Sequence, residues 1–214
     1  MRGFLALLLA FGCAARADEA PEARKRWAES PHGPMLERIL PPALEAKDLP
    51  QPESKGAQLV ARYCVQCHNL PSPAMHSAAR WPSVVARMVF RMEGHGNMGA
   101  LMADMMAGVK APESGERRAL LAYLRKNAQR PLDPARYPEL DQPPGEAFRL
   151  ACSQCHVLPD PRRHTAAEWP LVVARMERNM QWMNRVVGSK PVPGEPQLRV
   201  EEIDAFLRKY ARRP

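Results

Sequence analysis

Apolar residues recur at helical spacing in several stretches of the chain, and no stretch alternates as a half-buried β-strand would. Val85, Met88 and Met92 fall at positions i, i+3 and i+7, which places them on one face of a helix expected to begin near Ser77. A matching helix is expected to begin near Thr165, where Glu168 completes a capping-box pattern. Further helices are predicted over about 56–64, 115–128, 145–152 and 199–212. The predicted fold class is therefore all-α.

One sequence unit occurs twice along the chain. Shifted by 88 residues, the stretch 64–92 falls on 152–180 with eighteen of 29 positions identical. The similarity resumes with a shift of 83, where 122–126 matches 205–209, so the first copy carries a connecting loop five residues longer. Repetition on this scale predicts two tandem units of the same fold.

The residues outside the repeat suggest how the chain is organised. Residues 1–17 combine a basic start, an apolar run and small residues ending at Ala17, which is typical of a secretory signal and favours a periplasmic location. Its removal would lower the formal charge from +8 to +6 and take away Cys13, which is alternatively a lipoprotein site. The rest divides into a proline-rich extension, the first unit, a proline-rich linker and the second unit, at 18–54, 55–131, 132–142 and 143–214.

Each unit contains one Cys-x-x-Cys-His motif. The motif residues are Cys64, Cys67 and His68 in the first unit, and Cys152, Cys155 and His156 in the second. Two cysteines three positions apart can both bond the vinyl groups of one porphyrin, and the next histidine can ligate its iron. A zinc site would require a second pair of cysteines 12 to 20 residues away, and a thioredoxin-like pair would require a βαβ context. The motifs therefore predict two covalently attached haem c groups.

The sixth iron ligand is predicted from methionines that recur in both units. Met92 and Met180 are preferred because they lie near the end of a predicted helix, where the chain can bend over the far face of a haem. Several alternatives stay open: Met88, Met176, Met183, His76, His164, and the loop residues Met98, Met102, Met105 and Met106. Without ligating the iron, the methionines would simply pack in the core.

Other residues recur around the motifs. Trp81 and Trp169 are expected in the core, each with its indole N–H bonded. Arg87 and Arg175 are expected either to pair haem propionates or to lie on a solvated helix face. The carbonyls that follow each motif are candidates to accept the second ring N–H of its histidine: Pro71, Pro73, Pro159 and Pro161.

The first unit contains Gly56, the Cys-x-x-Cys-His motif and the late aromatic residue Tyr123. Through these residues, the first unit resembles a minimal class I cytochrome c domain. The second unit resembles it through Gly145, its own motif and Phe206, and the pair is similar to dihaem cytochromes c built from two fused domains. The resemblance implies three to four helices around each haem, with a thioether usually as sixth ligand. Gly145 precedes its motif by seven residues instead of eight, so the first helix of the second unit is expected to pack differently.

These observations predict a periplasmic dihaem cytochrome that carries single electrons and is not an enzyme. The alternatives are a haem enzyme, of the dihaem peroxidase or thiosulfate-oxidising type, and a cytochrome subunit of a dehydrogenase or oxidase complex. The basic surface predicts an acidic redox partner and no nucleic acid. After the first dozen residues, no apolar run approaches the roughly 20 residues of a membrane span.

Overall fold

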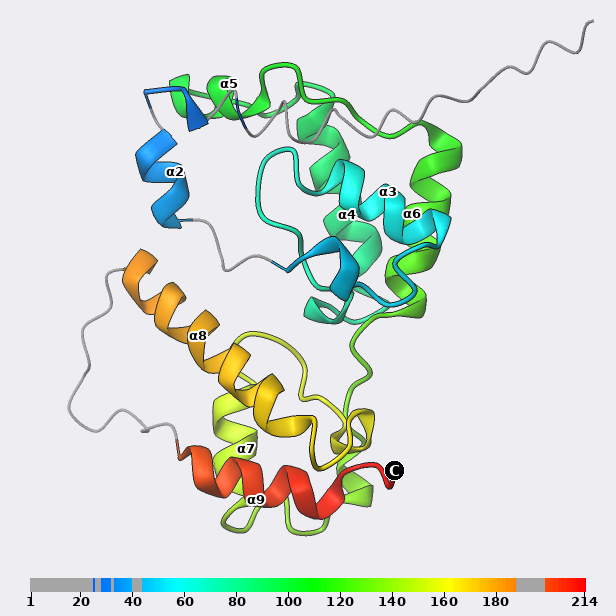
Figure 1. Ribbon diagram of the computed structural model, residues 1–214, viewed down its shortest axis with the longest axis vertical. Coiled ribbons are helices and arrows are strands. Elements are labelled where there is room, and N and C mark those ends of the chain that lie inside the picture. The colour runs from blue at the N-terminus through cyan, green and yellow to red at the C-terminus, as the bar shows by residue number, and fades with distance from the viewer. Residues whose placement is uncertain (1–24, 26–27, 32, 40–43, 188–198) are drawn as a thin grey trace, which may run out of the picture.

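The computed structural model describes residues 25, 28–31, 33–39, 44–187 and 199–214 (Figure 1). These residues are mostly helical, and their β-structure is limited to three isolated bridges, which confirms the all-α class. Residues 1–17, predicted as a secretory signal, and residues 188–198 lie outside the described residues. Among the helices that are described, none is long and apolar enough to cross a membrane.

Three helices of the first repeat enclose one hydrophobic cluster. They are α3 (Lys55–Tyr63), α4 (Trp81–Met92) and α6 (Ser114–Lys126), and α3 and α4 both pack against α6. A fourth helix, α5 (Ala100–Met106), lies in the longer loop of this repeat and has no buried residue. The large buried members of this first cluster are Leu59, Val60, Tyr63, Trp81, Val85, Val89, Leu120, Tyr123 and Leu124.

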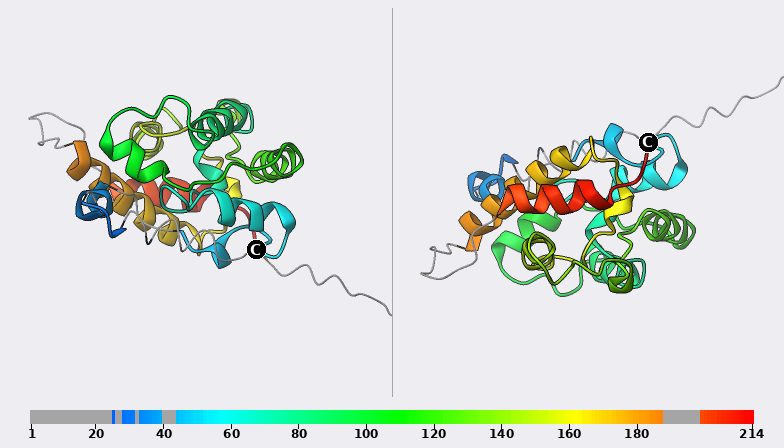
Figure 2. Two further views of the ribbon diagram at one scale, coloured as in Figure 1. Left: turned by 90° about the horizontal axis from the view of Figure 1, so that it is seen from above. Right: turned by 90° about the horizontal axis from the view of Figure 1, so that it is seen from below.

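The second repeat builds a second cluster from the matching helices. These are α7 (Gly145–Cys152), α8 (Trp169–Val187) and α9 (Val200–Tyr210), and α9 packs against both of the others. Figure 1 shows this group of helices below the first, and Figure 2 shows α8 and α9 side by side. The buried members of the second cluster are Leu132, Tyr137, Leu140, Ala147, Phe148, Trp169, Ile203, Phe206 and Leu207.

Both central helices begin four residues later than predicted. The residues from Ser77 and from Thr165 form turns that lead into α4 and α8. The predicted capping pattern is nevertheless present, because the Glu168 carboxylate accepts a 2.7 Å hydrogen bond from the Thr165 amide. The helices differ in length because Gly94 and Gly96 adopt φ of 90° and 65° after α4, which stops it, whereas α8 continues to Val187.

A glycine permits a close helix contact in each repeat, but the contacts differ. A Cβ on Gly56 would lie 2.3 Å from Tyr123 Cβ, so α3 crosses α6 at a distance that only glycine allows. A Cβ on Gly145 would instead lie 2.1 Å from the carbonyl oxygen of Glu139 and 2.8 Å from Leu140 Cα. The first helix of the second repeat therefore packs differently, as the shorter spacing predicts.

Segments outside the predicted units contribute to both clusters. Leu132, Tyr137 and Leu140, from the segment predicted as a linker, are buried in the second cluster around the 3₁₀ helix η3 (Pro134–Arg136). Leu49, from the predicted extension, is buried in the first cluster beside the 3₁₀ helix η1 (Ala46–Asp48). The linker is therefore packed against the second repeat over much of its length.

Hydrogen bonds join the two repeats directly. The Arg163 guanidinium, on the 3₁₀ helix η4 (Pro161–Arg163), donates to Gln129 Oε1 at 3.0 Å and to the Ala128 carbonyl at 3.2 Å. It also donates to the Asn127 carbonyl at 3.4 Å, just beyond the end of α6. A 2.9 Å bond from the Leu132 amide to the Leu158 carbonyl then ties the start of the predicted linker to the second repeat. The described repeats therefore meet at a polar interface in which Arg163 is the central donor.

Candidate functional site

The first motif begins where α3 ends. Cys64 is the C-cap of that helix, with its amide bonded to the Val60 carbonyl at 3.0 Å, and it packs against the first cluster. Burial raises the pKa of the Cys64 thiol to about 12 and that of the Cys67 thiol to about 11. Both sulfurs are therefore protonated at neutral pH and lie in a largely apolar setting.

Gln66 fastens a distant loop to the first motif. Its side-chain amide donates to the Lys110 carbonyl at 2.9 Å, and its Oε1 accepts from the Lys110 amide at 2.9 Å. Within the same segment, Met106 places its sulfur 3.7 Å from Cys67 Sγ. The end of α5 is thus held against the motif, and one of the loop methionines considered from sequence lies next to a motif cysteine.

The second motif has the same start and a more open end. Cys152 is the last residue of α7 and packs against the second cluster, and burial raises the pKa of its thiol to about 12. Cys155 is exposed, and the Gln154 side chain donates to the Leu150 carbonyl of α7 at 3.2 Å. The loop that corresponds to the α5 segment includes 188–198, which lies outside the described residues.

The two motif histidines make the same hydrogen bond. His68 Nδ1 lies 2.7 Å from the Asn69 carbonyl oxygen, and His156 Nδ1 lies 2.8 Å from the Val157 carbonyl oxygen. A carbonyl can only accept, so Nδ1 carries the proton and the lone pair is left on Nε2. The expectation that a proline carbonyl accepts this N–H is wrong, because the carbonyl of the next residue is closer along the chain.

The proline carbonyls bond the two tryptophans instead. Trp81 Nε1 donates to the Pro73 carbonyl at 2.8 Å, and Trp169 Nε1 donates to the Pro161 carbonyl at 2.8 Å. Both rings are buried, so the predicted core role of these tryptophans is confirmed. Each bond ties the loop that follows a motif to the start of the next helix, which limits how far the motif can move.

The recurring histidines His76 and His164 pack at the start of α4 and α8. Each ring meets a tryptophan edge-to-face, with centroids 4.9 Å apart for His76 and 4.8 Å apart for His164. Their carbonyls accept 2.9 Å bonds from the amides of Gln129 and Arg212, the residues that follow α6 and α9. Burial is the main cause that lowers the pKa of both imidazoles. Both histidines therefore lie at the start of a helix, each against a tryptophan.

The predicted methionine ligands lie on the matching helices. Met92 is half-buried and packs against the first cluster at the end of α4. Met180 is half-buried within α8, which continues to Val187, so the expectation that a helix ends near Met180 is wrong. Their identity as sixth ligands stays a prediction. Arg87 and Arg175 are exposed on the same two helices, which agrees with the solvated-face alternative.

The donor set around each motif fits a covalently attached haem. Each site offers two thiols at the end of a helix and one imidazole whose Nε2 carries a lone pair. Over the described parts of the chain, no three His, Cys, Asp or Glu side chains form a cluster that could hold a metal ion. No family model matches the sequence, and no curated protein or solved structure matches it either.

Proposed function

We propose that this chain is a dihaem c-type cytochrome that carries single electrons between redox partners. The observation that carries the proposal is the duplication of an entire haem-attachment setting. In both repeats the cysteines end a helix, the motif histidine donates Nδ1–H to the next carbonyl, and a buried tryptophan bonds the proline carbonyl beyond it. A zinc or thiol-redox role for the cysteines would not explain why the histidine and its hydrogen bond recur.

At each site, the cysteines and the histidine of the motif would have separate roles. The paired cysteine sulfurs would form thioethers with the porphyrin, and the histidine Nε2 would bind the iron from one side. The bond from Nδ1–H to the carbonyl fixes the tautomer and the ring orientation, and it makes Nε2 a stronger donor. When bound, the haem supplies a one-electron Fe(II)/Fe(III) couple. The buried residues that pack against Cys64 and Cys152 would lower the local dielectric constant on one side of each haem.

Met92 and Met180 are the proposed sixth ligands. A thioether is a soft, neutral donor that favours Fe(II), so it raises the reduction potential. In the first repeat, Met106 is a rival with specific support, since its sulfur already contacts the motif cysteine Cys67. Six-coordinate irons would leave no position for a substrate, which is why electron transfer is proposed instead of peroxidase or thiosulfate chemistry.

The two repeats would each form a cytochrome c-like domain around one haem, in a protein exported to the periplasm. An acidic redox partner is proposed because the chain carries a formal charge of +8, or +6 without residues 1–17. A role as a subunit of a larger redox complex is compatible with the same sites.

The proposal is tested by exporting the full chain in a host that attaches haem to c-type cytochromes. Mass spectrometry is expected to show two added haems in the wild type. The variants C64A/C67A and C152A/C155A should each carry one haem, and the control variant Ser153→Ala should carry two. An unmodified mass in such a host would overturn the proposal. Carbon monoxide distinguishes the enzyme alternative: rapid binding to the reduced wild type would reveal an open iron, whereas slow or absent binding supports electron transfer.

A further inference from the structure

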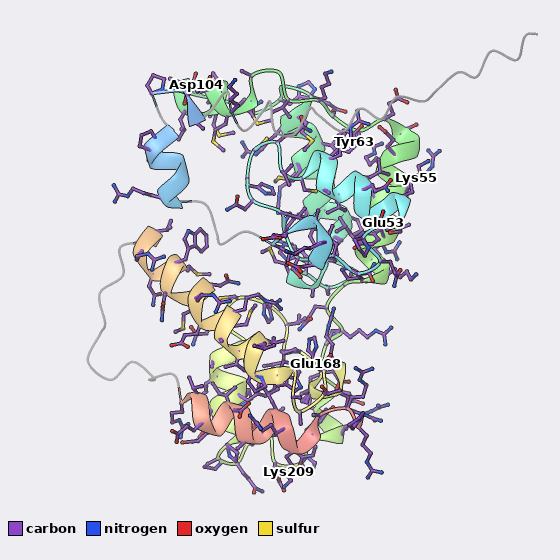
Figure 3. All side chains as sticks on the ribbon, viewed as in Figure 1. Glu53, Lys55, Tyr63, Asp104, Glu168 and Lys209 are labelled. Atoms are coloured by element: carbon purple, nitrogen blue, oxygen red, sulfur yellow. The ribbon has the colours of Figure 1, made fainter. Side chains whose placement is uncertain are left out.

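A basic pocket of about 570 Å³ lies where α9 ends. Five cationic side chains line it, and no acidic residue does: Arg136, Arg162, Lys209, Arg212 and Arg213. They come from η3, η4, α9 and the C-terminal residues, so segments far apart in the sequence converge here. Figure 3 shows Lys209 at the outer edge of this end of the molecule. A concave surface of a single charge sign concentrates its field and attracts groups of the opposite sign.

Three of the five cations already have a carboxylate partner. Lys209 Nζ lies 2.6 Å from Glu139, and the ion pairs of Arg136 with Asp133 and of Arg212 with Glu168 measure 3.3 and 3.7 Å. By contrast, the exposed guanidiniums of Arg162 and Arg213 form no ion pair with any carboxylate in the described part of the chain. These two arginines therefore supply the charge that is available to a ligand.

Backbone contacts join the pocket to the residues that precede α8 in the second repeat. The Arg212 amide donates to the His164 carbonyl at 2.9 Å, and Arg212 forms a bridge with Thr165. The Asp160 Oδ1 atom accepts bonds from the Tyr137 hydroxyl at 2.6 Å and from the Arg162 amide at 2.9 Å. It therefore anchors the loop that presents Arg162.

The first repeat keeps only part of this basic set, because Lys126 and Arg130 match Lys209 and Arg213. At the position matching Arg162 it has Ala74, and at the position matching Arg212 it has Gln129, which is buried in the contact with the second repeat. Arg162 and Arg212 are therefore the cations that only the second repeat has at these matched positions.

We propose that this pocket docks the acidic face of a redox partner protein on the second repeat, an inference that rests on the proposed function. Arg162 and Arg213 would pair with Asp or Glu side chains, whose planar carboxylates match the guanidinium fork. Both arginines are exposed, so water and salt weaken the ion pairs that they can form with a single small anion. A protein surface presents several carboxylates at once, and the weak pairs then add while still allowing rapid release.

The test measures binding of a fluorescein-labelled hexaglutamate peptide to the full chain at low ionic strength, by fluorescence anisotropy. R162Q/R213Q is expected to weaken binding by about tenfold, as the loss of two exposed ion pairs implies. The matched control R117Q/R118Q removes the same charge from exposed residues on α6 and is expected to change affinity by less than about twofold. Equal losses in the two variants would overturn the proposal, because binding would then follow net charge alone.

Two further measurements separate the possible failures. Inorganic phosphate and chloride are each titrated into the complex of the chain with the peptide. If both salts release the peptide at the same ionic strength, the result supports docking. If phosphate releases the peptide at a far lower concentration than chloride, the pocket is a small-anion site instead. The haem content of the same samples is determined by mass. Peptide binding at the pocket in a chain that takes up no haem would contradict the proposed function, whereas a haem-loaded chain indifferent to R162Q/R213Q would contradict the docking surface.

Discussion

Replacing Arg163 by Met should weaken the contact between the two repeats without damaging either core. Met is the residue that the first repeat has at the matching position, Met75, which lies exposed on η2 (Pro73–Met75). The Arg163 guanidinium makes its bonds at the polar interface, to residues 127–129. The substitution therefore isolates the interface from the rest of the fold.

The expected size of the effect follows from the hydrogen bonds that are lost. The two shorter bonds, at 3.0 and 3.2 Å, are worth about 1 kcal/mol each, because the guanidinium is partly exposed and water can replace part of them. The bond of 3.4 Å to Asn127 adds little. Arg163→Met should therefore lower the free energy of unfolding by about 2 kcal/mol, or the midpoint temperature by about 4–8 °C for a cooperative unit of this size.

Thermal and urea unfolding of the full chain, followed by circular dichroism, measure this loss. Arg162→Met is the control, since that side chain is exposed and makes none of these bonds, and it should change stability by less than about 0.5 kcal/mol. A double-mutant cycle of Arg163→Met with Gln129→Ala should give a coupling energy of about 1 kcal/mol. A coupling energy of zero, with Arg163→Met no worse than the control, would refute the interface.

Three other predictions concern the sites within the repeats. Trp169→Phe removes the 2.8 Å bond to a buried carbonyl and should destabilise the chain by about 1–2 kcal/mol in urea unfolding, and no loss would contradict the role given to that bond. The hydroxyl of Tyr63 donates to Glu116 and is the main cause that lowers the pKa of this carboxyl below 4.5. The stability it adds is therefore fully present above pH 4.5 and is lost as the pH falls through the lower folded pKa, so the gap between wild type and Glu116→Gln should close in acid; a gap independent of pH would count against it. If Met180 ligates the second iron, Met180→His should lower the potential of that haem alone and remove about half of the near-infrared sulfur-to-iron band, whereas loss of the band in Met176→His would move the ligand back by one helical turn.

The repeat and its main helices could be predicted from the sequence because local patterns determine them. The spacing of apolar residues gives α4 and α8, and the comparison of the two copies gives the tandem arrangement. The hydrogen bond of each motif histidine was assigned to the wrong carbonyl, because the distance from Nδ1 to Asn69 or Val157 depends on turn geometry that residue types do not encode.

Contacts between distant segments were also missed. Three contacts each join residues more than twenty positions apart. They are the bond of Tyr137 to Asp160, the contact of Met106 with a motif cysteine, and the bonds of Arg163. A proline-rich composition predicts an extended backbone, but it does not exclude an aromatic side chain from a neighbouring core. The signal available in the sequence was the presence of Tyr137 itself, because a large aromatic side chain in such a stretch commonly packs against a neighbouring core.

The different surroundings of Gly56 and Gly145 mean that the two copies are no longer interchangeable parts. With the cysteine motifs aligned, Ala57 of α3 matches Gly145, and Pro144 matches Gly56. A chimaera with α3 in place of α7 would bring the Ala57 methyl group within 2.1 Å of where Glu139 keeps its carbonyl oxygen. The reverse exchange would put a proline ring against the side chain at the α3–α6 crossing, where even a methyl group does not fit. The first helix of each repeat therefore fits only its own repeat, and α3 and α7 cannot be exchanged without a steric clash.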